Sequence, residues 1–356
     1  MKSKLIEQAQ NGIFTLIAEI GVNYYDIAIQ KGISPLDAAF LMIDEAKASG
    51  VHAVKFQTYK ANTLASRNSP YYWDITEEPT RSQFELFQKF DSFNENEYAL
   101  LSQHCNDKGI EFLSTAFDYE SSDYLVKYMN VCKISSSDLT NLPFINHQAL
   151  KGKPILLSVG ASDADEIDMA VNEIRKVNQE TLVLLHCVLE YPTPLEHANL
   201  RKITSLKERY PDVIIGYSDH TVPTDEKDVI KAAYLLGAVV VEKHFTLDKS
   251  LTGNDHYHAM DPSDARDILD RINKLNVICG DGALKSLETE ESARLNARRS
   301  IVSFVAIGKG TVVTNDMLIC KRPGTGIKPS EIDSLVGKKA LLDVSEDTIL
   351  QWDMFG

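Results

Sequence analysis

Long hydrophobic runs, paired cysteines and a glycine-rich nucleotide motif are all missing from this chain of 356 residues. No apolar segment approaches the roughly 20 residues that a membrane-spanning helix needs, and the basic N-terminal stretch MKSKLIEQAQNG lacks the apolar core of a signal peptide. The five cysteines lie far apart without a C-x-x-C pair, which favours reduced thiols and a cytoplasmic protein.

Positive charge is also scarce. The chain has 37 Lys and Arg against 51 Asp and Glu, a formal net charge of −14. Such a surface repels nucleic acids and anionic membranes, so neither is an expected partner. An anionic substrate would need a local basic island. The hydrophobic share of 44% and the charged share of 25% are ordinary for a folded globular enzyme.

Eight short apolar runs recur along the chain, each followed by a polar stretch with helical spacing. The runs are rich in β-branched residues and nearly continuous, as parallel strands are when helices cover both faces. They span residues 14–22, 51–57, 110–117, 131–137, 154–160, 181–188, 213–219 and 238–245. Eight such units over about 270 residues predict a (β/α)8 TIM barrel.

An open doubly wound sheet is the alternative fold, but no glycine-rich dinucleotide motif follows the first strand. The pattern changes after the eighth unit. We expect a catalytic barrel over residues 1–285, an irregular, charged linker over 286–300 and a small compact domain over 301–356. The long stretch around Asp74, after the second strand, is expected to be a functional loop.

Polar residues follow every predicted strand. In a barrel these strand ends meet at one mouth, where the active site is built. In chain order they are Glu19; Lys55 and Gln57; Ser114 and Thr115; Lys133, Ser136 and Asp138; Ser158; His186, Glu190 and Tyr191; Ser218, Asp219 and His220; and Glu242 and His244.

Two lysines and two histidines stand out in this set. Lys55 and Lys133 can hold a phosphate and a carboxylate, although each can equally be a structural lysine with its head in water. His220 and His244 end neighbouring strands and can share one divalent cation, the alternative being two separate core histidines. His256 can face the same mouth or lie in a solvated loop, as can its neighbour His258.

At these residues the sequence resembles the sialic acid synthases and their relatives that make other nonulosonic acids. The resemblance covers nearly the whole chain and ends with ARRS and KRPGTGI in a C-terminal antifreeze-like (SAF) domain. The motifs that carry it are, in order, IAEIGVN, AVKFQ, LSTAFD, KISSSD, ILLSVG, LLHC with EYPTP, GYSDHT, VEKHFT and GNDH.

The resemblance implies condensation of phosphoenolpyruvate with the open-chain aldehyde of an N-acyl mannosamine-type sugar, with C–O cleavage and release of phosphate. It implies a divalent ion, Mn²⁺ or Mg²⁺, held by His220 and His244, and places Glu19 near the reacting centre as a third catalytic residue. The residues implied to bind phosphoenolpyruvate are Lys55, Thr115, Lys133, Ser136, Ser158 and Ser218.

Sugar contacts are implied for the residues that match Gln57, Tyr191 and Asp255, and we place Asp138 with them. The resemblance also implies a domain-swapped homodimer. In it, Arg322 in the antifreeze-like domain of one chain reaches the N-acyl group of the sugar in its partner's barrel.

Four positions depart from the family pattern: Tyr24 with its neighbour Tyr25, Glu78, Leu189 and Ala259. We expect three of the four departures to lie near the sugar, so they leave its identity open. An aromatic pair with fewer polar contacts suits a deoxy, di-N-acyl sugar.

Two other functions stay open. One is a phosphoenolpyruvate–aldose condensing enzyme that acts on a phosphorylated sugar, for which few basic residues are in sight. The other is a non-catalytic sugar-binding barrel, against which the intact acid, lysines and histidines argue.

Overall fold

The structure is a computed structural model that describes residues 2–223, 227–253 and 255–356. The chain divides into two compact units, Met1–Cys279 and Gly280–Gly356. Asn254 of the GNDH motif lies outside the described residues.

The first unit is a closed barrel of eight parallel strands, in which each strand pairs with the next and β8 pairs with β1. This confirms the predicted TIM barrel and excludes the open sheet. The strands are β1 Thr15–Gly21, β2 Ala53–Thr58, β3 Glu111–Ala116, β4 Cys132–Ile134, β5 Ile155–Ser158, β6 Leu182–His186, β7 Ile214–Asp219 and β8 Val240–His244.

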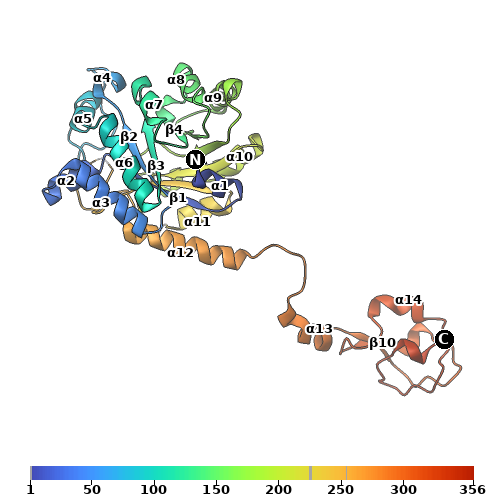
Figure 1. The fold of residues 1–356 in the computed structure, drawn as a ribbon. Coiled ribbons are helices and arrows are strands. Elements are labelled where there is room, and N and C mark those ends of the chain that lie inside the picture. Colours follow the sequence, from blue (N-terminus) through green and yellow to red (C-terminus); the bar gives the residue numbers. More distant parts are fainter. Residues whose placement is uncertain (1, 224–226, 254) are drawn as a thin grey trace. The chain divides into compact units, whose positions relative to one another are not determined.

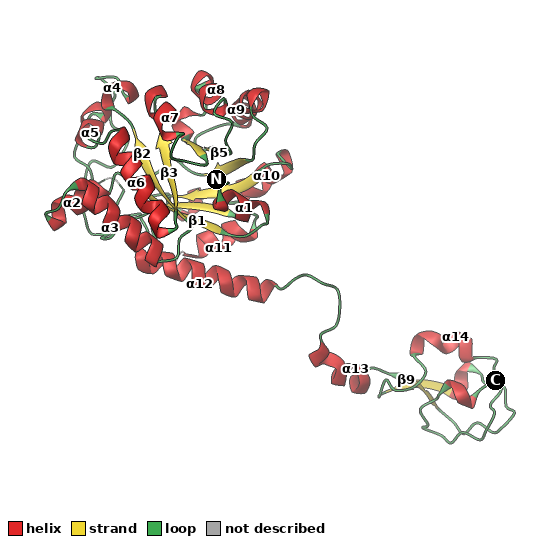
Figure 2. Ribbon diagram, in the orientation of Figure 1, coloured by secondary structure: helices red, strands yellow, loops and turns green. Residues whose placement is uncertain are grey.

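Helices surround the strands of this barrel (Figures 1 and 2). They are α1 Lys4–Gln10, α2 Tyr24–Lys31, α3 Pro35–Ala48, α4 Ala61–Leu64, α5 Gln83–Lys89, α6 Glu95–Lys108, α7 Tyr119–Leu125, α8 Leu142–Ala149, α9 Ala164–Val177, α10 Arg201–Arg209, α11 Lys227–Leu235 and α12 Pro262–Cys279, with the 3₁₀ turns η1 Ser136–Asp138 and η2 Leu195–His197. Local signals set their ends: Ser34 accepts a hydrogen bond from the backbone N–H of Asp37 at the start of α3, and Gly109 ends α6 in the left-handed region.

Alternate residues of each strand point into the barrel, and they form two layers. The lower layer is apolar and includes Ile17, Leu113, Val183 and Val240. Helix α1 packs its buried face against the same cluster at the N-terminal ends of the strands. One end of the barrel is therefore sealed by hydrophobic packing, and only the other end can hold a polar site.

The upper layer follows from the same alternation. The residue two positions after an inward apolar residue also points inward. Each of three polar residues stands two positions after an inward apolar one: Glu19 after Ile17, Thr115 after Leu113, and Glu242 after Val240. The polar ends of the predicted strands therefore face the mouth only where they keep this parity.

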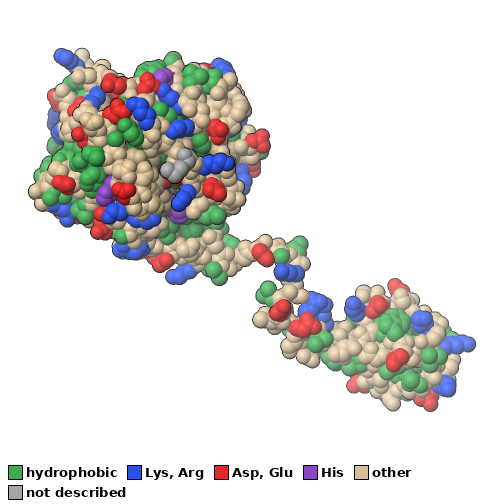
Figure 3. Space-filling model, in the orientation of Figure 1, with side chains coloured by type: hydrophobic (Ala, Val, Ile, Leu, Met, Phe, Trp, Pro, Cys, Tyr) green, Lys and Arg blue, Asp and Glu red, His purple; other side chains and the backbone are tan. Residues whose placement is uncertain are grey.

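The loop between β2 and α6 is ordered by its own contacts. It contains α4 and α5, and it buries Trp73, whose indole N–H donates to the backbone carbonyls of Glu78 and Thr80. No helix among the described residues is long and apolar enough to cross a membrane. On the face of the barrel seen in Figure 3, acidic and basic side chains are interspersed rather than gathered into a broad basic patch.

The second unit has its own hydrophobic core, which includes Ile301, Val313, Leu335 and Leu350. Strand β9 pairs antiparallel with β10. The elements are η3 Glu288–Glu290, α13 Glu291–Ala297, β9 Ser300–Ser303, η4 Asn315–Met317, β10 Leu318–Lys321, η5 Pro329–Glu331, α14 Ile332–Leu335 and η6 Trp352–Met354. Helix α13 lies in the stretch that we expected to be an irregular linker.

Candidate active site

A polar pocket opens at the C-terminal ends of the barrel strands. All eight strands or the loops that follow them contribute to its walls. Its lining residues are Glu19, Lys55, Gln57, Thr115, Phe117, Lys133, Ser135, Ser136, Ser158, Cys187, Leu189, Tyr191, Ser218, His220, Glu242 and His244.

Glu19 and Lys55 form a buried ion pair on one side of this pocket. The Lys55 ammonium lies 2.5 Å from Glu19 Oε2, and Gln57 donates to Glu19 Oε1 at 3.1 Å. Lys55 also donates to Thr115 Oγ1 at 3.0 Å. Strand register explains the cluster, because β1 and β2 place Glu19 opposite Lys55 and β2 and β3 place Gln57 opposite Thr115.

Glu242 and Lys133 face each other on the other side. Lys133 donates to Ser158 Oγ at 2.9 Å and lies 3.7 Å from Glu242 Oε1. Ser218 donates to the same carboxylate oxygen at 3.2 Å. The second carboxylate oxygen lies 3.8 Å from the Lys55 ammonium, so Glu242 stands between the two lysines.

The four charges balance, so the pocket is not the basic island that we expected. Burial raises the pKa of Glu19, and the attraction of Lys55 offsets only part of that increase. Burial lowers the pKa of Lys133. Burial alone would raise the pKa of Glu242, but Lys133 and Lys55 hold it below its ordinary value. When an anion binds, the pocket must therefore take up a proton or a cation to balance the added charge. Glu19, whose pKa is raised, is the carboxylate that can take up this proton.

The hydroxyl of Ser136 is held in the pocket wall by the loop after β5. The backbone N–H of Gly160 donates to Ser136 Oγ at 2.8 Å, and Ser136 Oγ lies 3.1 Å from Cys187 Sγ. A Cβ at position 160 would come within 2.6 Å of Cys187 Sγ and 3.0 Å of Ser136 Oγ. Only glycine lets the loop after β5 approach this closely.

Two neutral imidazoles line the pocket beside Tyr191. His220 Nδ1 lies 2.6 Å from the carbonyl oxygen of Val188, so Nδ1 carries the proton and Nε2 keeps a free lone pair. The ring of Tyr191 lies tilted against that of His220 with centroids 4.2 Å apart, and the ring of His244 lies 5.7 Å from that of His220. Burial lowers the pKa of His220 to about 4.

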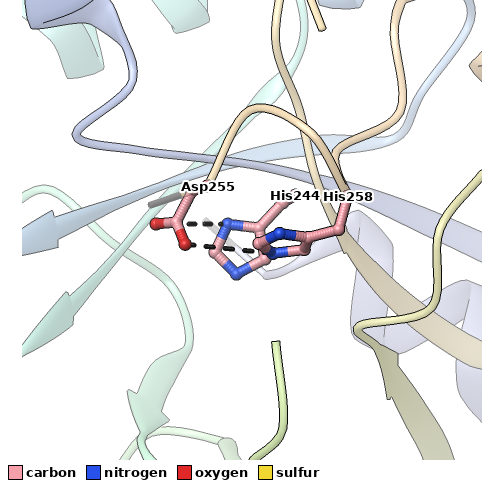
Figure 4. Close-up of side chains that lie close together, drawn as sticks. All are labelled: His244, Asp255 and His258. Carbon is pink, nitrogen blue, oxygen red and sulfur yellow. Dashed lines mark ion pairs between the residues drawn. The ribbon is translucent and has the colours of Figure 1, made fainter. Parts of the chain in front are cut away.

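The donor set behind His244 fits a divalent cation. His244, Asp255 and His258 each offer one ligand atom, and these atoms lie within 4.8 Å of one another (Figure 4). Burial, followed by repulsion from His258, lowers the pKa of His244, so its imidazole is neutral and able to bind metal. Burial raises the pKa of Asp255 to about 7. Neutral imidazoles and one carboxylate are typical ligands of a catalytic metal with open positions.

Several residues that were assigned to the site lie elsewhere. Asp138 and Asp255 do not line the pocket, although Asp255 joins His244 just behind it. Arg322 belongs to the second unit, where its side chain is exposed. The resemblance gave Asp255 to the sugar, and in the structure its carboxylate lies 3.6 Å from His244 Nδ1 and 3.8 Å from His258 Nε2.

Four polar residues at strand ends were wrongly grouped with the mouth. Ser114 forms a hydrogen bond with Thr58, and His186 forms one with the carbonyl oxygen of Ala198. Asp219 forms an ion pair with Lys243, and Glu190 forms one with the exposed His197. Ser114, His186 and Asp219 each stand one residue from an inward position, so the strand pleat turns them outward.

The four departures from the family pattern are mostly used for packing. Tyr24 is buried and stacks on Tyr25 and Phe93, with centroids 4.6 and 4.8 Å away. Glu78 forms an ion pair with Lys89, with 2.9 Å between Oε1 and Nζ, and Ala259 is buried. Leu189 alone of the four lines the pocket. The expectation that three of them face the sugar is therefore not supported by the pocket walls.

Three residues have a larger place in the structure than the sequence indicated. Glu242 bridges the lysines, Cys187 lines the pocket beside Ser136, and His258 is fully buried rather than solvated. The alternation of side chains along β6 could have predicted that Cys187 faces the pocket, because Cys187 stands two residues after the inward Leu185. For His258 an inward position was one of the two alternatives, and no local pattern decided between them.

Known protein families and several relatives match this chain. A model of the NeuB family matches residues 42–284, and a model of the SAF domain matches residues 298–356. The N,N'-diacetyllegionaminic acid synthase of Legionella pneumophila is 36% identical, with 95% of this chain and 93% of the relative covered. The N-acetylneuraminate-9-phosphate synthase of Homo sapiens is 31% identical, with 94% and 91% covered.

One solved structure extends the likeness to three dimensions. The N-acetylneuraminic acid synthetase of Leptospira borgpetersenii, in complex with citrate, is 30% identical and superposes with a TM-score of 0.68 over 79% of this chain and 90% of that chain. A barrel with this polar mouth, the matched family model over most of the barrel and relatives above 30% identity lead to one conclusion: the chain belongs to the NeuB family and carries a C-terminal SAF domain.

Proposed function

We propose that this protein is a nonulosonic acid synthase, which condenses phosphoenolpyruvate with the aldehyde form of an N-acyl mannosamine-type sugar. The observation that carries the proposal is the paired arrangement of Lys55 with Thr115 and Lys133 with Ser158, beside the imidazoles of His220 and His244. The names of the relatives support the same class of product.

The lysines and hydroxyls account for binding of phosphoenolpyruvate. Lys133, Ser158, Ser218 and Ser136 line the pocket and offer donors to a phosphate or carboxylate, and the Gly160 amide holds the Ser136 hydroxyl in place. Lys55 with Thr115 supplies donors on the opposite side. Fixed donors in a buried pocket stabilise charge more effectively than water does, because they need no reorganisation during the reaction.

The chemistry then follows from the substrates. The enol carbon of phosphoenolpyruvate attacks the aldehyde carbon, and a C–C bond forms. Water adds to the cationic carbon left behind, and the tetrahedral product loses phosphate by C–O cleavage. A divalent ion bound beside the imidazoles would polarise the aldehyde oxygen as a Lewis acid.

Glu19 is the proposed proton carrier. Its raised pKa suits an acid that exchanges protons with the substrates, and its carboxylate lies beside Lys55 in the wall of the pocket. Glu19 is placed to take the proton of the attacking water or to deliver one to the aldehyde oxygen. Gln57 holds it in place from the side of the proposed sugar site.

The pocket favours an unphosphorylated sugar. Among the described residues that line it, the only lysines are Lys55 and Lys133, and both face carboxylates. A second phosphate would therefore meet no free cation. Tyr191 offers an aromatic face to the sugar, and Leu189 adds an apolar contact, which together suit a deoxy, di-N-acyl sugar.

A domain-swapped homodimer would complete this site. The SAF domain is a separate compact unit with an exposed arginine, Arg322, and the site in the barrel has little to contact a sugar N-acyl group beyond Tyr191. We propose that Arg322 of a second copy of this chain supplies that contact.

Phosphate release tests the function. The protein is incubated with Mn²⁺, phosphoenolpyruvate labelled with ¹⁸O in the bridging position, and one sugar at a time: N-acetylmannosamine, its 6-phosphate and a di-N-acetyl deoxy analogue. We expect labelled phosphate with an unphosphorylated sugar. Turnover only with the 6-phosphate would favour the other condensing activity, and no phosphate with any sugar would exclude a synthase.

A further inference from the structure

A second cavity (the outer cavity) lies between the ends of β5 and β6 and the helices α9 and α10, which are labelled in Figure 1. Its volume is about 270 Å³, close to the lower end of the roughly 300–1,000 Å³ of known ligand pockets. Among the described residues, it shares none of its lining with the polar pocket of the barrel mouth (the mouth pocket). It lies wholly within the first unit, so a single chain forms it.

The walls of the outer cavity combine aliphatic side chains with cations. Val159 and Leu206 contribute apolar surface, and Lys202 and Arg209 of α10 contribute positive charge. Arg209 is paired, because its Nε donates to the Asp168 carboxylate of α9 at 3.0 Å. Lys202 is exposed, and among the described residues no hydrogen bond or ion pair holds its ammonium. The outer cavity therefore joins an apolar interior to one free cation.

These walls suit a small organic anion with an apolar body. An apolar cavity of about 150 Å³ already holds a benzene ring, so the larger outer cavity has room for a ring that carries one charged group. Burial of the apolar body would supply most of the affinity. A carboxylate or phosphate group would meet Lys202 at the rim, and a neutral ligand of the same shape would lack this contact.

The outer cavity and the mouth pocket lie back to back on the same two strand ends. Ser158 lines the mouth pocket, and its neighbour Val159 lines the outer cavity. Cys187 and its neighbour His186 divide in the same way after β6. The backbone N–H of Val159 donates to the carbonyl oxygen of Leu185 at 3.0 Å, which ties the two strand ends together. An occupant of the outer cavity thus rests on the backbone that positions proposed donors to phosphoenolpyruvate.

The loop after β5 makes the link closer. Ser162 lines the outer cavity and donates to the carbonyl oxygen of Gly160 at 2.9 Å. The N–H of Gly160 in turn donates to Ser136 in the mouth pocket at 2.8 Å. Between them, Ala161 has a φ of 49°, in the left-handed region that is unfavourable for a residue with a Cβ. A ligand packed against this loop would help to hold Ala161 in that conformation and Gly160 beside Ser136.

We propose that the outer cavity is a second ligand site, which binds a small organic anion with an apolar body and thereby tightens the binding of phosphoenolpyruvate in the mouth pocket. The site itself is independent of the proposed function, and only the coupling rests on it. Coupling between two sites typically changes affinity by about 5- to 150-fold. We expect about fivefold, because the two sites communicate only through shared strand ends and one loop. The coupling is reciprocal, so phosphoenolpyruvate must tighten binding of the anion equally.

Binding to the full-length chain is measured with benzoate and phenyl phosphate as probes and with benzamide as a neutral probe of similar shape. Titrations followed by ligand-observed NMR give the dissociation constants. Ser205→Phe places a ring in the cavity from an exposed position on α10, and Lys202→Met removes the charge but keeps the apolar stem. The matched control is Lys207→Met, an exposed lysine of α10 that does not line the cavity. Circular dichroism and thermal melting show that each variant is folded.

We expect both anions to bind the wild type and Lys207→Met alike. Benzamide should bind at least about fivefold more weakly, and Lys202→Met should weaken the anions by about fivefold, the upper end for an exposed ion pair. Ser205→Phe should abolish binding. The stronger of the two anions identifies the preferred charged group. Absence of binding to the wild type, equal binding of benzamide and benzoate, or binding that survives in folded Ser205→Phe would overturn the site; in the last case, displacement by phosphoenolpyruvate would place the anion in the mouth pocket.

Calorimetry with phosphoenolpyruvate measures the coupling separately. Saturating benzoate should lower the Kd of phosphoenolpyruvate by about fivefold in the wild type and in Lys207→Met, and should not lower it in Ser205→Phe. Benzoate that binds in the outer cavity without this effect would overturn the coupling. If phosphoenolpyruvate fails to bind at all, that result contradicts the proposed function instead, and the anion titrations still decide the site.

Discussion

The Lys55 ammonium lies 2.5 Å from the Glu19 carboxylate in the wall of the barrel mouth. Both side chains are almost completely buried, so fixed protein donors, not water, surround the acid. Lys55 thus has two tasks that compete: it stabilises the charge of Glu19, and it is a proposed donor to the substrate anion. Binding of that anion weakens the hold of Lys55 on Glu19 and makes the acid easier to protonate.

Replacing Glu19 by Gln should separate binding from chemistry. The amide keeps the shape and removes the charge, so Lys55 becomes free for the anion. We expect kcat to fall by about 10²- to 10⁴-fold, as for the loss of a general acid or base, while phosphoenolpyruvate binds as tightly or more tightly. Calorimetric binding and single-turnover kinetics measure the two effects. The control is Glu190→Gln, an acid paired with His197 outside the pocket. Weaker binding with an unchanged kcat would give Glu19 a role in binding alone.

Lys243 has a different task, although it stands between Glu242 and His244. Its ammonium lies 2.6 Å from Asp219 Oδ2 and donates to the carbonyl of Thr221 at 2.7 Å, and both charged side chains are 2% exposed. Lys243→Met would leave a buried carboxylate unpaired, which should cost about 3–5 kcal/mol of folding free energy. Urea titration measures this loss. Adding Asp219→Asn should recover part of it.

The same variant should leave binding intact. Lys243 does not line the pocket, so the affinity of the folded variant for phosphoenolpyruvate at low temperature should be within about twofold of the wild type. A large loss of affinity with little loss of stability would mean that Lys243 contacts the substrate.

Much of the fold could be predicted because hydrophobic periodicity and the covering of both sheet faces leave a simple signature in the sequence. The run of Val239, Val240 and Val241 is such a case. It leads into the end of β8, where Glu242 and His244 line the pocket. The pleat also explains the errors. His186 was assigned to the mouth by its position at a strand end, but it is one residue out of phase with Leu185 and turns toward Ala198.

Loop geometry could not be predicted in the same way. The burial of His258 depends on how the loop after β8 folds back, and no periodic pattern encodes that path. Glu78 illustrates the same limit. Its position suggested a sugar contact, whereas its carboxylate forms an ion pair with Lys89 and accepts a hydrogen bond from the backbone N–H of Thr80. Side chains in loops are fixed by the path that the loop takes, which no hydrophobic period in the sequence encodes.

Gly160 should be essential for anion binding. An alanine Cβ would press against Cys187 Sγ at 2.6 Å and Ser136 Oγ at 3.0 Å and would displace the amide that donates to Ser136. We expect Gly160→Ala to raise the KM for phosphoenolpyruvate by at least about tenfold, the equivalent of one good hydrogen bond. Steady-state kinetics provide the check. Gly308→Ala is the control, because its Cβ would find its nearest neighbour at 3.6 Å. An unchanged KM would show that this loop does not bind the anion.

Asp138 should make the free energy of unfolding fall as the pH rises. Burial raises the pKa of its carboxyl to about 6, and Oδ2 is buried without a partner among the described residues. The unfolded value is about 3.9, so the folded state holds the proton more tightly, and this contribution is present below pH 4 and lost as the pH passes about 6. Asp138→Asn should be close to the wild type at pH 4 and more stable at pH 8, by at most about 3 kcal/mol.

The surface carboxyl of Asp168 gives the opposite sign. Hydrogen bonds from Arg209 and Tyr210 lower its pKa to about 2, so its stabilising effect is present above pH 4 and lost as the pH falls toward 2. Asp168→Asn should therefore be slightly less stable than the wild type at pH 8. Urea titrations across this pH range compare the two variants. An Asp138→Asn profile parallel to that of the wild type would show that Asp138 is solvated.

Subunit mixing tests the proposed role of Arg322 in a partner's site. If the SAF domain completes the site of a second copy, Arg322→Ala removes a sugar contact from the partner, whereas His244→Ala damages the barrel of its own chain. Each variant alone should have little activity. Heterodimers of the two contain one site with an intact barrel and an intact arginine, so mixing should restore activity toward about a quarter of the wild type when exchange is random, because half of the dimers then carry one good site of two. Native mass spectrometry establishes the exchange. The matched control mixes Arg322→Ala with Arg322→Lys, in which both barrels are intact and no complete arginine is present, and it should give no recovery above the average of the two. Exchange without recovery in the first mixture would confine Arg322 to its own chain.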